Sequence, residues 1–182
     1  MLRRTTELAS TTTGEIRQTV TGWMEQYGQD VWVFIYAAVR NQDVADDLTQ
    51  EVFLRAFRHA NQFRQASSVK TWLFAIARNA VRDHRRSAFV RRVQLVDDVA
   101  HHVESTMEPS QLPSPEVEDA WPLVMQLKEA DREVIVLRLR DDLSFAEISS
   151  ITHVSEPALR VRYQRALKRL RKLYRKGGDP NA

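Results

Sequence analysis

The stretch SFAEISSITHVSEPALRVRYQRALKRLR, residues 144–171, predicts two helices with a short turn between them. Ser144 and Glu147 have the spacing of a capping box, in which a serine that starts a helix and a glutamate three residues later each accept a backbone N–H bond from the other. The turn follows at residues 152–154, and a long basic helix comes after it. This order of helix, short turn and basic helix is the layout of helix-turn-helix DNA-binding proteins.

Three residues around the turn fit a second helix that begins near residue 156. Ser155 is a favourable N-cap, and Pro157 is tolerated in the first helical turn, where the N–H that proline lacks would have no helical partner. His153 stands where such turns often contain glycine, and histidine adopts a left-handed backbone more readily than most residues. We therefore expect Ser155 to cap the helix and His153 to have a structural role.

The last helix has an apolar face and a basic face. Its apolar stripe consists of Leu159, Tyr163, Ala166, Leu167, Leu170 and Leu173. The opposite arc holds Pro157, Ala158, Val161, Gln164, Arg165, Lys168 and Arg169, with Arg160 and Arg162 on its margins. Nine basic residues and no acid lie between Pro157 and Lys176, and without acidic partners at i,i+4 spacing these charges repel one another. A polyanion would compensate them.

Side chains near the start of such a helix enter the major groove, whereas cations farther along contact phosphates. The residues predicted to read base sequence are Glu156, Arg160, Val161, Gln164 and Arg165.

Composition excludes several kinds of site. The 182-residue chain has no cysteine, so it has no disulfide framework, thiolate zinc site or cysteine nucleophile. It also lacks a Gly-rich phosphate loop, a catalytic triad and an HExxH motif, so we expect no enzymatic activity, no catalytic residues and no cofactor. No apolar run approaches the ~18 residues of a membrane span, and no signal peptide is recognisable. We expect a soluble, cytoplasmic protein with no membrane insertion.

One group of side chains offers metal-ligand chemistry, but it lies in a segment of linker composition. It consists of Asp97, Asp98, His101, His102 and Glu104. Tight metal binding needs ligands held in a fixed geometry, which a linker does not provide. A metal protein is therefore an alternative that we do not favour.

Charge is segregated along the chain. The overall net charge is +3, but residues 1–87 carry +3, residues 88–119 carry −5 and residues 120–182 carry +5. The acidic segment combines prolines, serines and acids, which is linker composition.

We therefore predict an all-α fold of two small helical domains joined by a flexible acidic linker. The predicted parts are a disordered tail at 1–14, a domain at 15–87, the linker at 88–119, a second domain at 120–176 and a tail at 177–182. Helices are expected at 16–40, 44–58 and 70–86, and another within 127–140 that starts at Asp131.

The sequence DDLTQEVFLRAF, residues 46–57, predicts a helix with two distinct faces. Its core stripe is Ala45, Leu48, Val52 and Ala56, and the other side carries Asp47, Gln50, Glu51, Leu54 and Phe57. A leucine and a phenylalanine among acids suggest a surface that a partner covers. The alternative is that Leu54 and Phe57 pack on the first helix of the same domain.

The helix at 70–86 also has two faces. Leu73, Ile76, Ala77, Ala80 and Val81 form the apolar one, and Thr71, Ala75, Arg78, Asn79, Arg82 and Arg86 lie opposite, with Trp72 at the edge. Proteins that hold single-stranded nucleic acid combine flat side chains, amides and cations. Trp72 and Asn79, with Asn61 and Phe63 in the preceding loop, supply such groups. Alternatively, Trp72, Phe74 and Phe63 belong to the core.

Taken in order, DDLTQEVFLRAF, SVKTWLFAIARNAVRDHRRS, an acidic linker and SFAEISSITHVSEPALRVRYQRALKRLR resemble the extracytoplasmic-function (ECF) sigma factors, the two-domain sigma subunits of bacterial RNA polymerase. The resemblance extends from about residue 20 to residue 175. The chain departs from the family pattern at Asp142, where glycine is frequent, and at Pro157 and Ala158. These departures leave the sequence of the minus-thirty-five element undefined.

The resemblance implies a promoter-specificity factor whose partners are core RNA polymerase, promoter DNA and an anti-sigma factor. Contact with the polymerase, through the clamp of its largest subunit and its flap, is assigned to a surface containing Asp47, Gln50, Glu51, Leu54 and Phe57. Binding of single-stranded minus-ten DNA is assigned to Asn61, Phe63, Lys70, Trp72, Arg78, Asn79, Arg82 and Arg86. Binding of duplex minus-thirty-five DNA is assigned to Ser155, Glu156, Arg160, Val161, Gln164, Arg165 and Lys168.

A stand-alone helix-turn-helix regulator with a sensory N-terminal domain is the remaining alternative. Such a protein would bind a palindrome as a dimer, because two half-sites require two reading helices. It gives no account of the Leu54 and Phe57 face or of the helix at 70–86.

Overall fold

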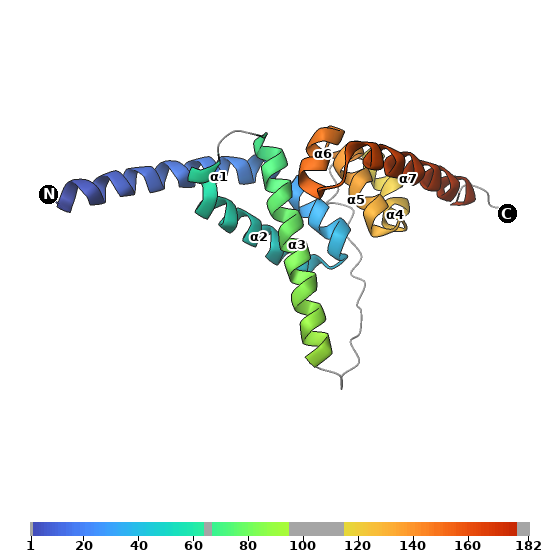
Figure 1. Ribbon diagram of the computed structural model, residues 1–182, viewed down its shortest axis with the longest axis horizontal. Coiled ribbons are helices and arrows are strands. Elements are labelled where there is room, and N and C mark those ends of the chain that lie inside the picture. Colours follow the sequence, from blue (N-terminus) through green and yellow to red (C-terminus); the bar gives the residue numbers. More distant parts are fainter. Residues whose placement is uncertain (1, 64–66, 95–114, 178–182) are drawn as a thin grey trace.

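The computed structural model describes the backbone of residues 2–63, 67–94 and 115–177, and the side chains of residues 13–63, 67–89 and 120–175 (Figure 1). Every regular element within these residues is a helix, and none is a strand. The predicted all-α class is confirmed. Among the described helices, none has both the length and the hydrophobicity that a membrane crossing requires.

The N-terminal domain consists of three helices and a single 3-10 turn. They are α1 (Leu2–Val39), α2 (Gln42–His59), η1 (Ala60–Gln62) and α3 (Val69–Gln94). Arg40 has a left-handed backbone, with φ of 56°, and ends α1. Asn41 then caps α2, because its side-chain oxygen accepts the Val44 N–H at 3.0 Å. The reversal between α1 and α2 therefore follows from two adjacent residues.

Apolar faces of these three helices form the domain core. Val31, Phe34 and Ile35 of α1 are buried against Val52 of α2 and Phe74 of α3. The core stripe predicted for α2 is also buried throughout, with at most 6% of any of its side chains exposed. The three helices predicted in this half of the chain are confirmed.

The structure differs from the prediction at the N-terminus. It begins α1 at Leu2, whereas a disordered tail was expected up to residue 14. No proline interrupts this stretch, and adding residues to an existing helix is far easier than starting a new one.

The C-terminal domain contains four α-helices and one π-helical segment. They are α4 (Pro115–Met125), α5 (Glu129–Ile135), η3 (Val136–Arg140), α6 (Phe145–Thr152) and α7 (Glu156–Gly177). Its core includes Trp121, Leu137, Ile148 and Leu159.

The predicted helix start at Asp131 is wrong. The helix begins at Glu129, after Lys128 in the N-cap position. Asp131 instead lies buried and forms an ion pair with Arg169 of α7. Asp131 does lie in the first turn of the helix, but its carboxylate binds a distant arginine, a tertiary contact that the local sequence does not reveal.

The predicted linker at 88–119 is too long at both ends. Helix α3 continues to Gln94, and α4 begins with Pro115 in the first helical position, where proline is favourable. The central part of that linker, residues 95–114, lies outside the described residues, as does the predicted tail beyond Gly177.

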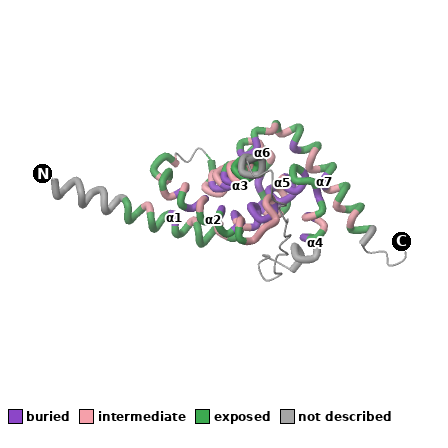
Figure 2. The backbone as a smooth tube through the Cα atoms, turned by 90° about the horizontal axis from the view of Figure 1, so that it is seen from below, coloured by how far each residue is buried: buried purple, intermediate pink, exposed green. Residues whose placement is uncertain are grey.

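The two domains contact each other. Helix α3 lies against α6, and α1 lies against α5 and η3. Figure 1 shows the N-terminal part of α1, the C-terminal part of α3 and the end of α7 projecting away from this common body. In Figure 2 the buried residues gather in the centre and along the inner sides of the helices.

Candidate functional site

The helix-turn-helix is formed by α6 and α7, and its first helix has the predicted capping box. Ser144 Oγ accepts the Glu147 N–H at 3.2 Å, and Glu147 Oε2 accepts the Ser144 N–H at 2.8 Å. Two N–H groups at the helix start are thereby satisfied.

The turn between the two helices depends on His153. Its backbone is left-handed, with φ of 58° and ψ of 27°, and its N–H donates to the Ser149 carbonyl at 2.8 Å. The Thr152 hydroxyl accepts the Val154 N–H at 3.3 Å. The structural role predicted for His153 is confirmed. Asp142, with φ of 55°, is also left-handed, which explains why glycine suits that position.

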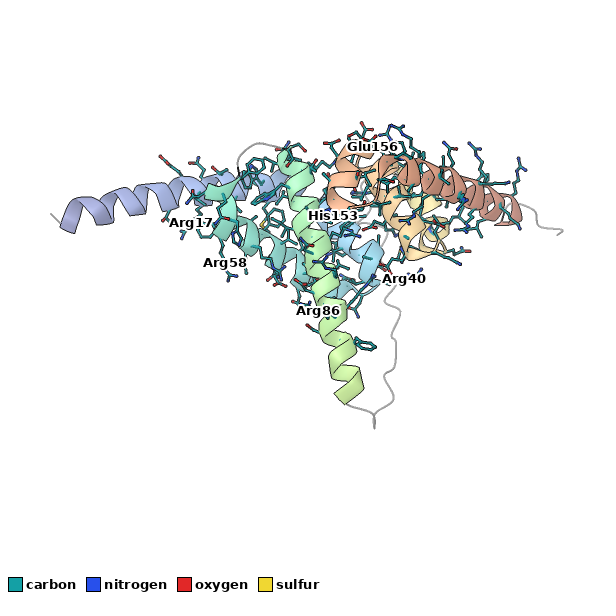
Figure 3. All side chains as sticks on the ribbon, in the orientation of Figure 1. Arg17, Arg40, Arg58, Arg86, His153 and Glu156 are labelled. Atoms are coloured by element: carbon teal, nitrogen blue, oxygen red, sulfur yellow. The ribbon has the colours of Figure 1, made fainter. Side chains whose placement is uncertain are left out.

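Helix α7 begins at Glu156, as the sequence predicts, and turns its basic face outward. Val161 is 50% exposed, and the residues around it on this face, Arg160, Gln164, Arg165 and Lys168, are exposed as well. Ser155 is exposed and Glu156 is half-buried. Figure 3 labels His153, which ends α6, and Glu156, which begins α7.

Two cations of α7 have acidic partners that the sequence analysis did not foresee. Arg160 pairs with Glu156 at 3.2 Å and also lies over the Phe145 ring, 4.6 Å from its centroid. Arg169 pairs with Asp131 inside the domain. The expectation that no acid compensates this helix is therefore wrong for these two arginines. Glu156 lies just before the segment 157–176 in which acids were counted, and Asp131 is distant in sequence.

The outer face of α2 is as predicted for four residues and differs for one. Leu54 is 56% exposed, Asp47 and Gln50 are exposed, and Glu51 is half-buried. Phe57 is half-buried and packs against the core. For Phe57, then, the alternative of packing within the domain is partly correct.

An aromatic cluster stands at the start of α3. Trp72 lies 5.1 Å from Phe63 and 5.8 Å from Trp23, measured between ring centroids, and Trp23 lies 5.8 Å from Phe63. All three rings are half-buried. Phe74 is fully buried, so the core interpretation holds for it. Trp23 was missed, because its own helix gives no sign that it meets Trp72.

The polar residues assigned to the minus-ten element are not all free. Asn61, Asn79 and Arg82 are exposed. The Arg86 side chain, on the lower half of α3 in Figure 3, is 80% exposed and lies 3.9 Å from the Asp83 carboxylate. Lys70, by contrast, pairs with Asp30 at 3.2 Å. Arg78 pairs with Glu133 of the other domain at 2.9 Å.

Three ionisable groups near the domain contact have shifted pKa values. Burial raises the pKa of Asp141 to about 7, against the opposing effect of Arg140. Burial, with the charge of Arg40, lowers the pKa of Arg132 to about 10. Burial alone would raise the pKa of Glu147, but hydrogen bonds from Ser144 and other hydroxyls outweigh it, so this pKa is lowered.

Within the described residues, no group of three His, Asp or Glu side chains is placed to hold a metal ion. The histidine and carboxylate cluster considered above, residues 97–104, lies outside these residues.

Comparison with known proteins gives a consistent result. Residues 23–89 match the family model for Sigma-70 region 2, and residues 122–170 match that for Sigma-70 region 4. The two matches coincide with the two helical domains. The chain thus has the domain composition of a sigma factor.

The similarity extends over most of the chain. It is 31% identical to ECF RNA polymerase sigma factor SigM of Bacillus subtilis, over 84% of this chain and 93% of that protein. It is 34% identical to ECF RNA polymerase sigma factor BldN of Streptomyces coelicolor, over 82% of this chain and 58% of that protein. The chain belongs to the ECF RNA polymerase sigma factors.

A solved structure shares the fold. The sigma factor RpoE of Bartonella quintana, in complex with the anti-sigma factor NepR, superposes with a TM-score of 0.71 at 24% identity, covering 85% of this chain and 96% of that chain.

Proposed function

We propose that this sigma factor brings core RNA polymerase to specific promoters by dividing the task among three surfaces. The exposed face of α2 binds the polymerase, the aromatic and amide groups around α3 hold melted minus-ten DNA, and α7 reads the minus-thirty-five duplex. The observation that carries this proposal is the order of two sigma-family domains along the chain, each with an outward polar face.

The exposed face of α7 suits a duplex. Gln164 and Val161 stand among exposed cations on the first turns of the helix, where a recognition helix meets base edges. Arg165 and Lys168 supply the phosphate contacts that hold the helix in register. Affinity for duplex DNA should therefore fall steeply with salt.

The surfaces around α3 suit single strands. Trp72 and Phe63 offer ring faces for stacking, Asn61 and Asn79 offer amides for base edges, and Arg82 offers a cation for the backbone. These groups suit binding, so in this proposal the protein acts without catalysis or cofactor, in the cytoplasm where the polymerase works.

An anti-sigma factor is the expected regulator. The similar RpoE forms a complex with such a protein, and the exposed Leu54 offers a partner of this chain an apolar surface.

In vitro transcription tests the proposal. Core polymerase is incubated with a library of promoter fragments, with and without the purified chain, and the transcripts are sequenced. We expect a subset of fragments, sharing two elements, to be transcribed only when the chain is present. If the chain selects no promoter, the proposed function is wrong.

A further inference from the structure

The ring of Phe145, the first residue of α6, carries two guanidinium groups. The guanidinium carbon of Arg160 lies 4.6 Å from the ring centroid, and that of Arg138 lies 5.7 Å from it. Both distances are within the range in which a ring face attracts a cation. Phe145 therefore connects Arg160, on the exposed side of α7, to the η3 segment that precedes the helix-turn-helix.

The Phe145 ring is itself held in place. It is half-buried and packs against the core. Tyr163 of α7 meets it edge-on, with 5.7 Å between the ring centroids and 73° between the ring planes, which is a favourable geometry for two aromatic rings. The ring is thus a fixed support, and a group that lies on it has a defined position.

Arg160 has a second contact within its own helix. Its Nη2 atom lies 3.2 Å from Oε2 of Glu156, one turn earlier, with 61% of the arginine side chain exposed. An ion pair this exposed contributes little to stability, but it has a geometric effect. The ring supports the face of the guanidinium while the carboxylate holds one end of it. Together they restrict a long side chain that would otherwise sample many rotamers.

These two contacts leave donors of Arg160 available. A guanidinium has five N–H donors in one plane. The interaction with the Phe145 ring uses the face of the group and none of its donors, and Glu156 engages only the Nη2 end. A planar group with an open N–H edge matches the O6 and N7 atoms of guanine in the major groove, which it can bind with two hydrogen bonds.

The position of Arg160 along α7 suits contact with a base. It lies next to Val161 and one turn before Gln164, both of them exposed, in the first turns of the helix, where a recognition helix meets base edges. A side chain that is already ordered in the free protein loses less entropy when it binds. A phosphate contact needs less of this order, because phosphates occur along the whole backbone and carry no sequence information.

We propose that Phe145 and Glu156 are positioning residues for Arg160, and that Arg160, held by them, selects a guanine in the duplex that α7 reads. The inference rests on the proposed function, since it takes α7 to be the duplex-reading helix. Phe145 acts through Arg160 and requires no DNA contact of its own. Sequence preference then depends in part on a residue of α6, outside the recognition helix.

Sequencing of bound DNA tests the proposal. Duplex fragments with a randomised segment are incubated with the purified full chain, and the bound fragments are sequenced to give the base preference at each position. We expect the natural chain to enrich guanine at one position. Arg160→Lys keeps the charge but lacks the planar fork, so it should lower this enrichment about tenfold or more.

The positioning residues should affect the same position. Phe145→Leu and Glu156→Ala should each lower the guanine enrichment about threefold to tenfold and leave the preference elsewhere unchanged. Phe145→Tyr keeps the ring face and should keep the enrichment. Phe53→Leu, which alters a buried ring of the N-terminal domain, controls for lost stability, and the melting temperature of every variant is measured. A merely structural role of Phe145 would weaken binding to all fragments by the same factor.

A double variant shows whether Phe145 acts through Arg160. Phe145→Leu/Arg160→Lys should have the same preference as Arg160→Lys alone, because the ring has then lost the group that it positions. The proposal is wrong if the natural chain enriches no guanine that depends on Arg160, if Phe145→Leu acts equally on all fragments, or if the two effects add. If the chain selects no promoter with core polymerase, the proposed function fails. The binding measurement uses no polymerase, so the two failures are distinguishable.

Discussion

Glu133 of α5 and Arg78 of α3 form an ion pair with a 2.9 Å contact, although 55 positions separate them in the sequence. The pair joins two domains that the family models treat as separate units. It also covers part of Arg78, whose side chain is 26% exposed.

The exposed leucine of α2 gives the first prediction. Leu54→Ala should leave the free energy of unfolding within about 0.5 kcal/mol of the natural value, because the side chain is 56% exposed. It should weaken binding to core polymerase by about 1.5 kcal/mol or more, if a partner buries the side chain. Binding is measured by competition against a labelled sigma factor. Met24→Ala is the matched control, since Met24 is 50% exposed on α1. Equal losses in both variants would contradict the assignment of α2.

The capping box gives the second prediction. Ser144→Ala removes the hydroxyl that accepts the Glu147 N–H, and loss of such a cap typically costs about 1 kcal/mol. Chemical denaturation followed by circular dichroism measures the change. Ser150→Ala is the control, because Ser150 is exposed on the same helix and its hydroxyl bonds only the Glu147 carbonyl. If Ser144→Ala and Ser150→Ala had the same denaturation midpoint, the cap would make no contribution to stability.

The turn before α7 gives the third prediction. His153→Gly should be tolerated, whereas His153→Val should destabilise the protein by about 1–2 kcal/mol, because a β-branched residue is strained at a φ of 58°. Thermal unfolding distinguishes the two variants. The exposed side chain of His153 makes lost packing a minor factor. If valine and glycine gave the same melting temperature, the backbone explanation would be wrong.

The buried acid of the domain contact gives the fourth prediction. The folded-state pKa of Asp141 is raised by burial to about 7, above its unfolded value. A carboxyl of this kind favours the folded state at low pH, and its contribution is lost as the pH rises toward 7. The free energy of unfolding should therefore decline as the pH rises from about 4 to about 7, between the unfolded and folded pKa values of this carboxyl. The charged groups that face Asp141 are Arg140, Asp30 and Lys70.

Asp141→Asn should flatten that decline, because an amide does not titrate. Asp142→Asn, which removes the neighbouring exposed carboxylate, should keep the natural slope. Urea denaturation at several pH values measures all three proteins. Identical slopes for the natural chain and Asp141→Asn would show that another group is responsible.

The basic face of α7 gives the fifth prediction. Lys168→Gln should weaken duplex binding by a similar factor on all sequences and reduce the salt slope of the binding constant by about one. Gln164→Ala should instead change the preference between sequences, with a loss of about 1–3 kcal/mol on the selected promoter. Anisotropy titrations at several salt concentrations separate the two effects. A sequence-dependent effect of Lys168→Gln would argue against its role as a phosphate contact.

Local features of the fold were predictable from the sequence. The capping box of Ser144 and Glu147, the left-handed His153 and the core stripe of α2 each depend on residues that are close together in the chain. Spacing and backbone preference determine such features. The helix-turn-helix and the all-α class follow from them.

Contacts between distant segments were not predictable. Asp131 was expected to start a helix, but it pairs with Arg169, and Trp23 meets Phe63 and Trp72 although nothing in its own helix marks it. Such pairings depend on how the helices pack, which residue types and spacing leave open. The same reason explains why the occupation of Arg78 by Glu133 was not foreseen.

Left-handed backbone at Asp142 and His153 precedes and follows α6, and the capping box fixes the start of that helix. The direction of α7 therefore depends on residues around α6, and none of these residues lies on the outer face of α7. Val161, Gln164 and Arg165 make no contribution to this scaffold, so they are free to vary. A duplicated copy of the gene could acquire a new set of target promoters through a few surface substitutions, without loss of foldability on the way.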